Sequence, residues 1–292
     1  MGLKSAKLNP NGPPLVSRRQ LTEVRSMTLA QTLDKDLQRS SGAITLEVDA
    51  GGAVKRMREE GCAKLRIPAR LAGQSPEAII INTSGGLAGG DRFEVEVLTK
   101  GELCLTTQAA EKIYRSLGSE TRVTTRFRAD GKAQLLWLPQ EAILFDGAQL
   151  KRSFDAELDA SATMLAVETV VLGRKAMKEQ LTDFSFHDHW RIRQNGRLIY
   201  ADDLRLDPTR VKGAAALNGA YAFATLVYVG PASESMLEPL REIIGSGGGV
   251  SAWDGKLIAR LVSVDGFEVR KTLIPALKLL SGKMQLPKVW TL

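Results

Sequence analysis

Short β-rich runs recur along most of this chain, and they constrain its fold more than any other feature of the sequence. From about Gly42 to Asp207 the runs alternate in polarity or favour β-branched and aromatic residues, with glycine-containing steps between them. The runs are residues 43–48, 63–67, 78–81, 93–98, 103–107, 122–128, 134–137, 151–158, 163–172, 181–192 and 197–200. This pattern predicts a mainly β fold in which the chain meanders through many strands. No strict period appears, so the spacing alone does not indicate solenoid repeats.

Two dipeptides predict tight turns between neighbouring runs. Asp130-Gly131 and Asn195-Gly196 each separate two β-rich runs. Such pairs readily adopt the positive φ angles of a type I′ turn, so each is expected to close a β-hairpin.

Helix signals are concentrated near the C-terminus. Ser235 and Glu238 have the spacing of a capping box, at the start of a segment that runs to Ile244 and stops at Gly245. Residues 268–280 place leucine and isoleucine at helical spacing, which predicts an amphipathic helix. Its apolar face is expected to pack on the core, because helices of this kind gain most of their stability from packing.

The remaining segments suggest one main domain. Residues 1–40 are polar and show little periodicity before 21–37, which predicts a mobile arm with one helix. Residues 41–292 are expected to form a single β-rich domain with helical elements at its C-terminal end. Within it, 214–229 is compatible with a helix before a strand, and the glycine-rich stretch 246–249 reads as a linker.

Composition indicates a globular protein with a large core. The chain has 292 residues, of which 43% are apolar. No apolar run is long enough to span a membrane and no apolar signal region follows the N-terminus, so a cytoplasmic protein is expected. Cys62 and Cys104 are the only cysteines. Two are too few for a disulfide framework or a thiolate metal cluster, and both are expected to be buried and inert.

The net charge of +7 raises nucleic acid as a partner, but its distribution argues against one. Residues 1–40 contain seven basic and three acidic side chains and so contribute +4 of the +7. The rest of the chain is close to neutral and lacks the basic stripe with interleaved aromatic residues of a nucleic-acid surface. A solvated basic tail is therefore preferred over a nucleic-acid interface.

Residues 79–91 form a glycine-rich segment, I-I-I-N-T-S-G-G-L-A-G-G-D. A phosphate loop would need Gly-Lys-Ser/Thr leading into a helix, and a dinucleotide site would need G-x-G-x-x-G opening one. Here the glycines lead instead into residues 92–97, which alternate in polarity. The segment is therefore predicted to join two strands, without the helix N-terminus that binds phosphate.

Four acidic residues lie in otherwise apolar surroundings: Glu141, Asp146, Glu168 and Glu179. Paired acids can act as general acid and base, so a carbohydrate-active β-solenoid enzyme is one hypothesis. The alternative, at similar weight, is that these acids cap turns or pair with Arg152 and Arg174, because unpaired carboxylates are seldom buried.

His187-Asp188-His189 is the one histidine cluster of the chain. In a strand the two imidazoles would share a face, as metal ligands can. Two ligands do not make a metal site, and the alternation continues beyond them, so a polar strand face is the favoured interpretation. No Ser/His/Asp set, nucleophile elbow or metal-hydrolase helix is visible.

Four long motifs, in order, resemble the urease accessory protein family UreD, also called UreH. They are I-I-N-T-S-G-G-L-A-G-G-D (80–91), T-T-Q-A-A-E-K-I-Y-R (106–115), L-P-Q-E-A-I-L-F-D-G-A (138–148) and E-T-V-V-L-G-R-K-A-M-K-E (168–179). Residues 197–202 and 286–290 are also similar to that family, so the resemblance runs from about residue 42 to the C-terminus.

The resemblance implies a mainly β, helix-like stack of strands with a few helices. It implies a chaperone-like scaffold, not an enzyme, that binds apo-urease and the partner UreF, which recruits the GTPase UreG. Members of the family are thought to pass nickel through an internal channel, so nickel in transit is expected without a tightly bound cofactor.

The chemistry of the residues is compatible with that role. Thiolates and imidazoles would hold Ni²⁺ tightly, whereas carboxylates and water suit an ion that must be released. The candidate carboxylates in the family motifs are Asp91, Glu111, Glu141, Asp146, Glu168 and Glu179. Our hypothesis is that Glu141, Asp146 and Glu168 line a metal path. Arg174 is expected to hold a neighbouring carboxylate, and Arg115 is a second supporting residue.

Overall fold

The computed structural model describes residues 39–70, 74–174, 177, 179–213 and 216–290. From Arg39 onward these residues form one compact unit. Most of the predicted arm, residues 1–38, lies outside the described residues, as does its predicted helix. Within the described residues no helix is both long and apolar enough to cross a membrane.

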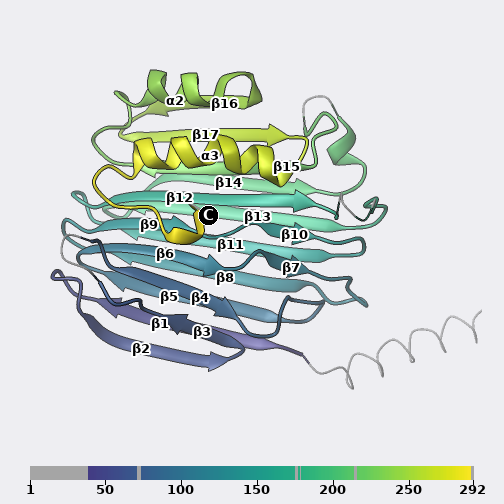
Figure 1. The fold of residues 1–292 in the computed structure, drawn as a ribbon, viewed down its shortest axis with the longest axis horizontal. Coiled ribbons are helices and arrows are strands. Elements are labelled where there is room, and N and C mark those ends of the chain that lie inside the picture. Colours follow the sequence, from purple (N-terminus) through teal and green to yellow (C-terminus); the bar gives the residue numbers. More distant parts are fainter. Residues whose placement is uncertain (1–38, 71–73, 175–176, 178, 214–215, 291–292) are drawn as a thin grey trace, which may run out of the picture. The chain divides into compact units, whose positions relative to one another are not determined.

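Strands dominate the fold and form two sheets (Figure 1). The first sheet has the order β14 (Arg197–Leu206), β13 (Ser185–Gln194), β11 (Gln149–Leu158), β8 (Thr121–Ala129), β5 (Arg92–Thr99), β1 (Ser41–Val48) and β2 (Val54–Gly61). The second has the order β16 (Gly248–Trp253), β17 (Lys256–Ser263), β15 (Ala222–Val229), β12 (Thr163–Leu172), β9 (Gln134–Leu138), β6 (Glu102–Gln108), β4 (Glu77–Asn82) and β3 (Ala63–Arg66). Two short strands, β7 (Glu111–Ile113) and β10 (Ala142–Leu144), extend the second sheet beside β12.

Successive long strands from β4 to β13 alternate between the two sheets, so the chain follows a helical path, with one strand of each sheet per turn. Neighbours in each sheet are therefore parallel, as in the series β5, β8, β11 and β13. The mainly β, helix-like stack is confirmed, whereas the expected meander is wrong for this region. A parallel neighbour needs a crossover, and here the crossover is a strand of the opposite sheet.

The two predicted hairpins have different outcomes. Asn195 and Gly196 have φ angles of 50° and 75° and join the antiparallel strands β13 and β14, as expected. Asp130-Gly131 does not close a hairpin, because β8 and β9 belong to different sheets. The same local turn signal therefore also occurs where the chain passes from one sheet to the other.

Two apolar cores result from this arrangement. Inward residues of both sheets, among them Phe154, Trp190 and Leu105, fill the space between the sheets. The second sheet also packs against the C-terminal helices α2 (Leu237–Ile244) and α3 (Gly266–Leu280), through residues such as Leu273 and Leu277. Strand β12 is consequently buried on both faces. The predicted core-packing helix is confirmed, and Asp265, which the sequence analysis did not single out, caps its N-terminus.

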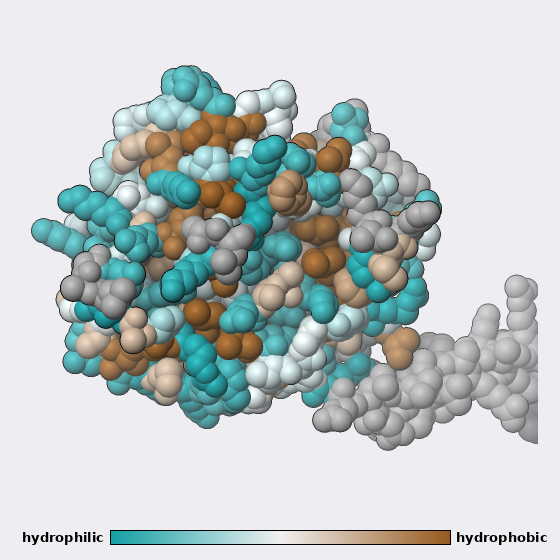
Figure 2. All heavy atoms as spheres, in the orientation of Figure 1, coloured by the Kyte–Doolittle hydropathy of each residue, from teal (hydrophilic) through white to brown (hydrophobic). Residues whose placement is uncertain are grey.

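Apolar side chains gather in the upper part of the face seen in Figure 2, over the region of α2 and α3. At the end of β17 and the start of α3, three large apolar side chains stay exposed: Val262, Val264 and Phe267. Phe267 is 72% exposed. Val264 and Phe267 are neighbours at the start of α3, whereas alternation along β17 places Val262 on the face opposite to Leu261, which packs with α3.

Three local expectations near the C-terminus need correction. Residues 246–249 are not a linker, since a 3₁₀ turn (Gly245–Gly247) leads directly into β16, which pairs with β17. The Ser235 hydroxyl donates to the Ala232 carbonyl and does not cap α2. The described residues of 214–229 form turns and then β15, without a helix. In each case a tertiary or alternative local partner outweighs the local propensity.

Candidate functional site

The candidate residues fall into four separate places in the structure. Glu111 and Glu168 line a cavity between the sheets. Asp146, Glu179, Arg115 and Arg174 line an open depression at the ends of the strands. Asp91 lies in the glycine-rich loop, and Glu141 lies beside α3. The structure thus does not bring Glu141, Asp146 and Glu168 together in one cavity.

The cavity between the sheets has a volume of about 70 Å³. That volume is enough for several water molecules. Most of its wall is apolar, and its polar side chains are those of Thr107, Glu111, Thr125, Gln140, Arg152 and Glu168, together with the indole of Trp137. The Nε2 group of Gln140 is buried without a hydrogen-bond partner in the described structure. This amide is an exception to the rule that buried polar groups are hydrogen-bonded.

Glu168 is held in this cavity by two donors. Its Oε1 accepts from the Trp137 indole at 2.8 Å, and its Oε2 accepts from Arg152 Nη1 at 2.5 Å. Arg152 in turn donates to both oxygens of Asp188, at 2.9 and 2.7 Å. Burial raises the pKa of Glu168, and the charge of Arg152 opposes that effect. The network therefore fixes the carboxylate and balances one buried cation against two acids.

Glu111 lies between this cavity and a second one of about 240 Å³. Ile80, Phe93 and Thr107 are also shared by the two walls. Asn82 Nδ2 donates to both Glu111 oxygens, at 3.1 and 3.2 Å. Burial raises the pKa of Glu111 to about 7. Its side chain therefore changes charge near neutral pH, at the junction of the two cavities.

Glu141 is linked to Glu111 through the backbone only. The Glu111 N–H donates to the Glu141 carbonyl at 2.8 Å, where β7 and β10 pair. The Glu141 carboxylate is directed to Arg270 of α3, with 4.0 Å between Oε2 and Nη1. Its side chain is not among those that line the cavity.

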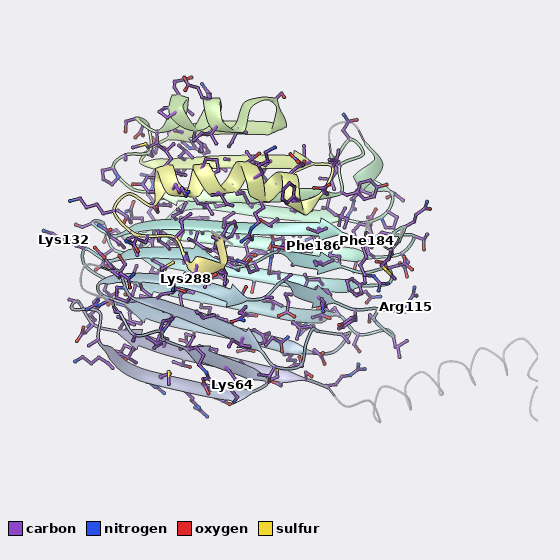
Figure 3. All side chains as sticks on the ribbon, viewed as in Figure 1. Lys64, Arg115, Lys132, Phe184, Phe186 and Lys288 are labelled. Atoms are coloured by element: carbon purple, nitrogen blue, oxygen red, sulfur yellow. The ribbon has the colours of Figure 1, made fainter. Side chains whose placement is uncertain are left out.

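The open depression of about 530 Å³ is built on ion pairs. Arg115 Nη2 donates to Asp146 Oδ2 at 2.5 Å, and Arg174 donates to both oxygens of Glu179, at 2.9 and 3.0 Å. Arg174 therefore holds a carboxylate, and its guanidinium lies 4.3 Å from the centre of the Phe145 ring. Figure 3 shows Arg115 at one end of the strands and Lys132 at the other.

Asp146 anchors the turn after β10. Its Oδ1 accepts from the backbone N–H groups of Asp183 and Thr182, at 3.0 and 2.7 Å. The Asp183 hydrogen bond is the largest of the effects that lower the pKa of Asp146. The oxygens of Asp146 and Glu179 are thus engaged in holding loops together, which matches the turn-capping alternative for these acids.

The glycine-rich segment joins β4 to β5, as predicted, and no helix follows it. Asp91 ends the loop and accepts from the backbone N–H groups of Ser40 and Ala88, at 2.7 and 2.8 Å. Leu87 pairs with β7 through hydrogen bonds to Lys112 and Tyr114. A side chain at Gly86, whose φ is 151°, would collide with the Lys112 carbonyl. The loop is therefore a structural wall next to Glu111.

Sequence reasoning missed three residues that shape the cavity: Trp137, Asp188 and Asn82. Asp188 lies on the inner face of β13, between the two histidines, where alternation predicts its burial. The sequence suggests Arg152 as a partner only for Glu141, Asp146, Glu168 and Glu179. The pairing between Arg152 and Asp188 spans 36 residues, so no local pattern indicates it.

Comparison with known proteins gives a consistent result. A family model described as "UreD urease accessory protein" matches residues 40–291. The chain is 48% identical over 250 residues to a protein of Rhizobium leguminosarum bv. viciae named "Urease accessory protein UreD", covering 84% of this chain and 91% of that one. Proteins of the same name are 45% identical in Agrobacterium fabrum, over 85% and 89% of the two chains, and 45% identical in Rhizobium etli, over 91% and 100%.

Proposed function

This chain belongs to the UreD family of urease accessory proteins, and we propose that it serves urease maturation as a scaffold and nickel conduit. In this proposal it binds apo-urease and UreF, and UreF recruits the GTPase UreG. Nickel passes through the protein without being held tightly, and the chain itself catalyses no reaction. The cytoplasm, where urease would be assembled, is the proposed location.

The observation that carries the proposal is the pair of cavities that share Glu111. The outer cavity reaches the loop residues Gly85 and Lys112, and the inner one reaches Glu168 in the middle of β12. Together they provide polar groups at successive depths between the two sheets. Oxygen ligands and water suit a divalent ion that must be released again. No cysteine or histidine is among the residues that line either cavity in the described structure.

The two acids differ in what they offer to an ion. Glu168 already accepts from Trp137 and Arg152, so an ion would interact with it mainly through water. Glu111 has a pKa of about 7 and accepts from neutral donors, the Asn82 amide and the Lys112 backbone, whereas Glu168 is paired with a cation. We therefore propose Glu111 as the residue that admits the ion, and Glu168 with Arg152 as the fixed inner wall.

The exposed side chains of Val264 and Phe267, at the start of α3, support the scaffold role. These side chains offer an apolar surface for a partner protein. The carbohydrate-enzyme hypothesis has less support, because an acid and base pair needs two available carboxylates. Glu168 is engaged by two donors, which leaves Glu111 without an available acidic partner in this cavity.

The proposal is tested by co-expressing the tagged chain with urease, UreF and UreG in the presence of nickel. Wild type is expected to co-purify with urease and UreF, and to give nickel-loaded, active urease. Glu111→Ala should retain partner binding but lower the nickel content of urease several-fold. Glu94→Gln, an exposed carboxylate on β5, is the matched control and should leave nickel content unchanged.

Two results would contradict the proposal. A wild-type chain that binds neither urease nor UreF would remove the scaffold role. Full nickel content with both Glu111→Ala and the bulkier Glu111→Leu would remove the conduit through these cavities.

A further inference from the structure

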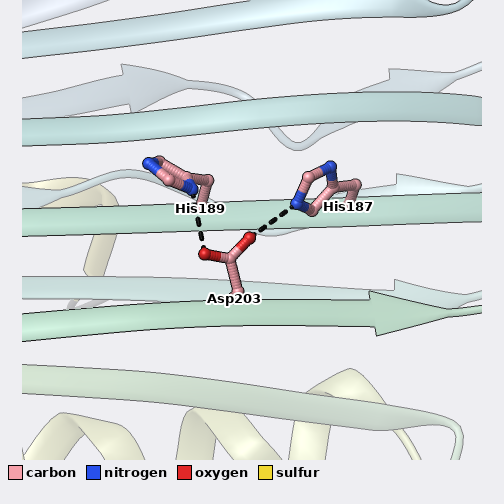
Figure 4. Close-up of side chains that lie close together, drawn as sticks. All are labelled: His187, His189 and Asp203. Carbon is pink, nitrogen blue, oxygen red and sulfur yellow. Dashed lines mark hydrogen bonds and ion pairs between the residues drawn. The ribbon is translucent and has the colours of Figure 1, made fainter.

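The outer face of the first sheet carries a cluster of His187, His189 and Asp203 (Figure 4). The two histidines alternate with buried residues along β13, so both imidazoles lie on the outer face. Asp203 lies on β14, directly opposite His189 in the antiparallel register. The expected polar strand face is present, and the neighbouring strand adds a carboxylate that the histidine motif alone does not reveal.

The geometry points to a surface site for one divalent transition-metal ion, such as Ni²⁺ or Zn²⁺, with His187, His189 and Asp203 as its protein ligands. One potential ligand atom from each residue lies within 4.8 Å of the others. Imidazole nitrogen and carboxylate oxygen are ligands that such ions accept. With three protein ligands, the remaining coordination positions would be taken by water.

The present distances are close to those that a bound ion requires. His187 Nε2 lies 2.8 Å from Asp203 Oδ1, and His189 Nδ1 lies 3.1 Å from Oδ2. Tetrahedral metal–ligand bonds of about 2.0–2.2 Å place neighbouring ligand atoms about 3.3–3.6 Å apart. An ion could therefore replace these hydrogen bonds after each contact opens by about half an ångström, with the three ligand atoms drawn around it from their present mutual spacing of at most 4.8 Å.

Arg191 orients the carboxylate from the side. Its Nη2 donates to Asp203 Oδ2 at 2.8 Å, while its Nη1 donates to the backbone carbonyls of Trp190 and Asp202. Oδ2 is thereby held by a cation, and Oδ1 remains directed to His187. Arg191 thus fixes the orientation of the carboxylate, while its positive charge opposes a bound cation.

The surrounding charges suggest an exchangeable site. Lys151 and Arg205 lie opposite His187 on the two neighbouring strands. Their positive charges lower the affinity for a cation, although both are exposed and screened by water. The site lies on the outer face of the first sheet, whereas Glu111 and Glu168 line the cavity between the sheets. It is therefore independent of the proposed conduit.

The test uses the full chain without a polyhistidine tag. His187 and His189 are the only histidines among 292 residues, so the imidazole resonances of the labelled protein report on this site alone. Zn²⁺ is titrated into ¹⁵N-histidine-labelled protein, and Ni²⁺ binding is measured by calorimetry. Both imidazoles are expected to shift along one saturating curve as a single ion binds.

The variants identify the ligands. The double variant His187→Ala/His189→Ala and the single variant Asp203→Asn should each weaken binding at this site by about tenfold or more. Glu94→Gln, an exposed carboxylate on the same sheet, should bind as wild type does. Circular dichroism checks that every variant is folded. The imidazole titration is done on the wild-type protein, so it tests the site even if a variant does not fold.

The inference would be overturned by imidazoles that do not respond to Zn²⁺, or by variants that bind the ion as tightly as wild type. These readouts do not involve urease. A failure of urease activation therefore leaves this inference standing, and a failure of metal binding here leaves the interior conduit untouched.

Discussion

Replacing Arg152 by methionine removes the one cation that holds two buried acids. The side chain of Arg152 is 6% exposed, and those of Glu168 and Asp188 are 8% and 4% exposed. Methionine retains much of the arginine stem but offers no donor to either carboxylate. The variant must therefore bury uncompensated negative charge or take up protons as it folds.

The expected loss of stability follows from either route. Removing one partner of a buried ion pair typically costs about 3–5 kcal/mol. Protonating an ordinary glutamate costs about 3.5 kcal/mol at pH 7, but only about 1 kcal/mol at pH 5. We therefore expect Arg152→Met to lower the free energy of unfolding by about 3–5 kcal/mol at pH 7, and by less at pH 5. For a domain of this size, the loss at pH 7 corresponds to a fall in Tm of about 6–20 °C.

The sign of the pH dependence follows from proton binding. Burial raises the pKa of Glu168 in the folded protein, and the loss of Arg152 raises it further. Between the unfolded and the folded pKa, the folded state binds more protons than the unfolded state. The stability of the variant therefore falls as pH rises through this range.

Denaturant unfolding at pH 5 and pH 7 measures both effects. Arg128→Met is the matched control, because Arg128 pairs with Asp130 but is 66% exposed, so water screens the pair and its loss should change stability little. The triple variant Arg152→Met/Glu168→Gln/Asp188→Asn should recover most of the lost stability, since none of these three positions then carries a buried charge. A loss at pH 7 no larger than that of Arg128→Met would refute the reasoning.

Three further predictions concern other parts of the fold. Burial raises the pKa of Glu111 to about 7, so the free energy of unfolding should fall by up to about 3 kcal/mol as pH rises from about 4.5 to 7 and Glu111 must ionise in a buried site. Glu111→Gln cannot ionise and should remove this fall, as measured by denaturant unfolding across that pH range. Leu277→Ala empties a fully buried site in α3 and should cost about 2–5 kcal/mol in chemical denaturation. Asp91→Ala leaves the N–H groups of Ser40 and Ala88 without their acceptor and should cost about 2 kcal/mol or more, measured as a lower Tm.

Each of these substitutions has a control on the surface. Glu94→Gln should leave the pH profile unchanged, Leu198→Ala at a 46% exposed site should cost less than about 1 kcal/mol, and Glu96→Ala at an exposed site of β5 should leave Tm nearly unchanged. A control that destabilises as much as its buried counterpart would contradict the burial argument. A Glu111→Gln profile identical to wild type would show that this carboxylate titrates normally.

Local sequence patterns predict some features of the fold and not others. Alternation along β5 predicts which side chains face the core, and helical spacing predicts α3. Both follow from the 2.0 and 3.6 residue periods of strands and helices, which are local properties. Asp254-Gly255, with φ angles of 49° and 73°, closes the hairpin between β16 and β17 and carries the same turn signal as Asn195-Gly196. Asp130-Gly131 carries the same signal but changes sheets, because turn chemistry does not specify the partner strand.

The candidate site contains acids whose roles local sequence does not predict. Glu111 and Glu168 were among the acids selected, but so were Asp146 and Glu179, which hold loops at the strand ends. Local sequence does not distinguish an acid that faces a cavity from one that accepts backbone N–H groups. The difference arises from contacts such as that between Trp137 and Glu168, which are 31 residues apart.

The sequence by itself establishes a strand-rich chain with two C-terminal helices and membership of the UreD family, because alternation, spacing and motif order are readable residue by residue. Which side chains meet depends on the tertiary structure. The alternation of strands between two sheets brings Arg152 to Glu168 and Asp188, and the β13–β14 register brings Asp203 to the two histidines. These contacts are made by residues distant in the chain, whose proximity results from packing and strand pairing and not from local propensity.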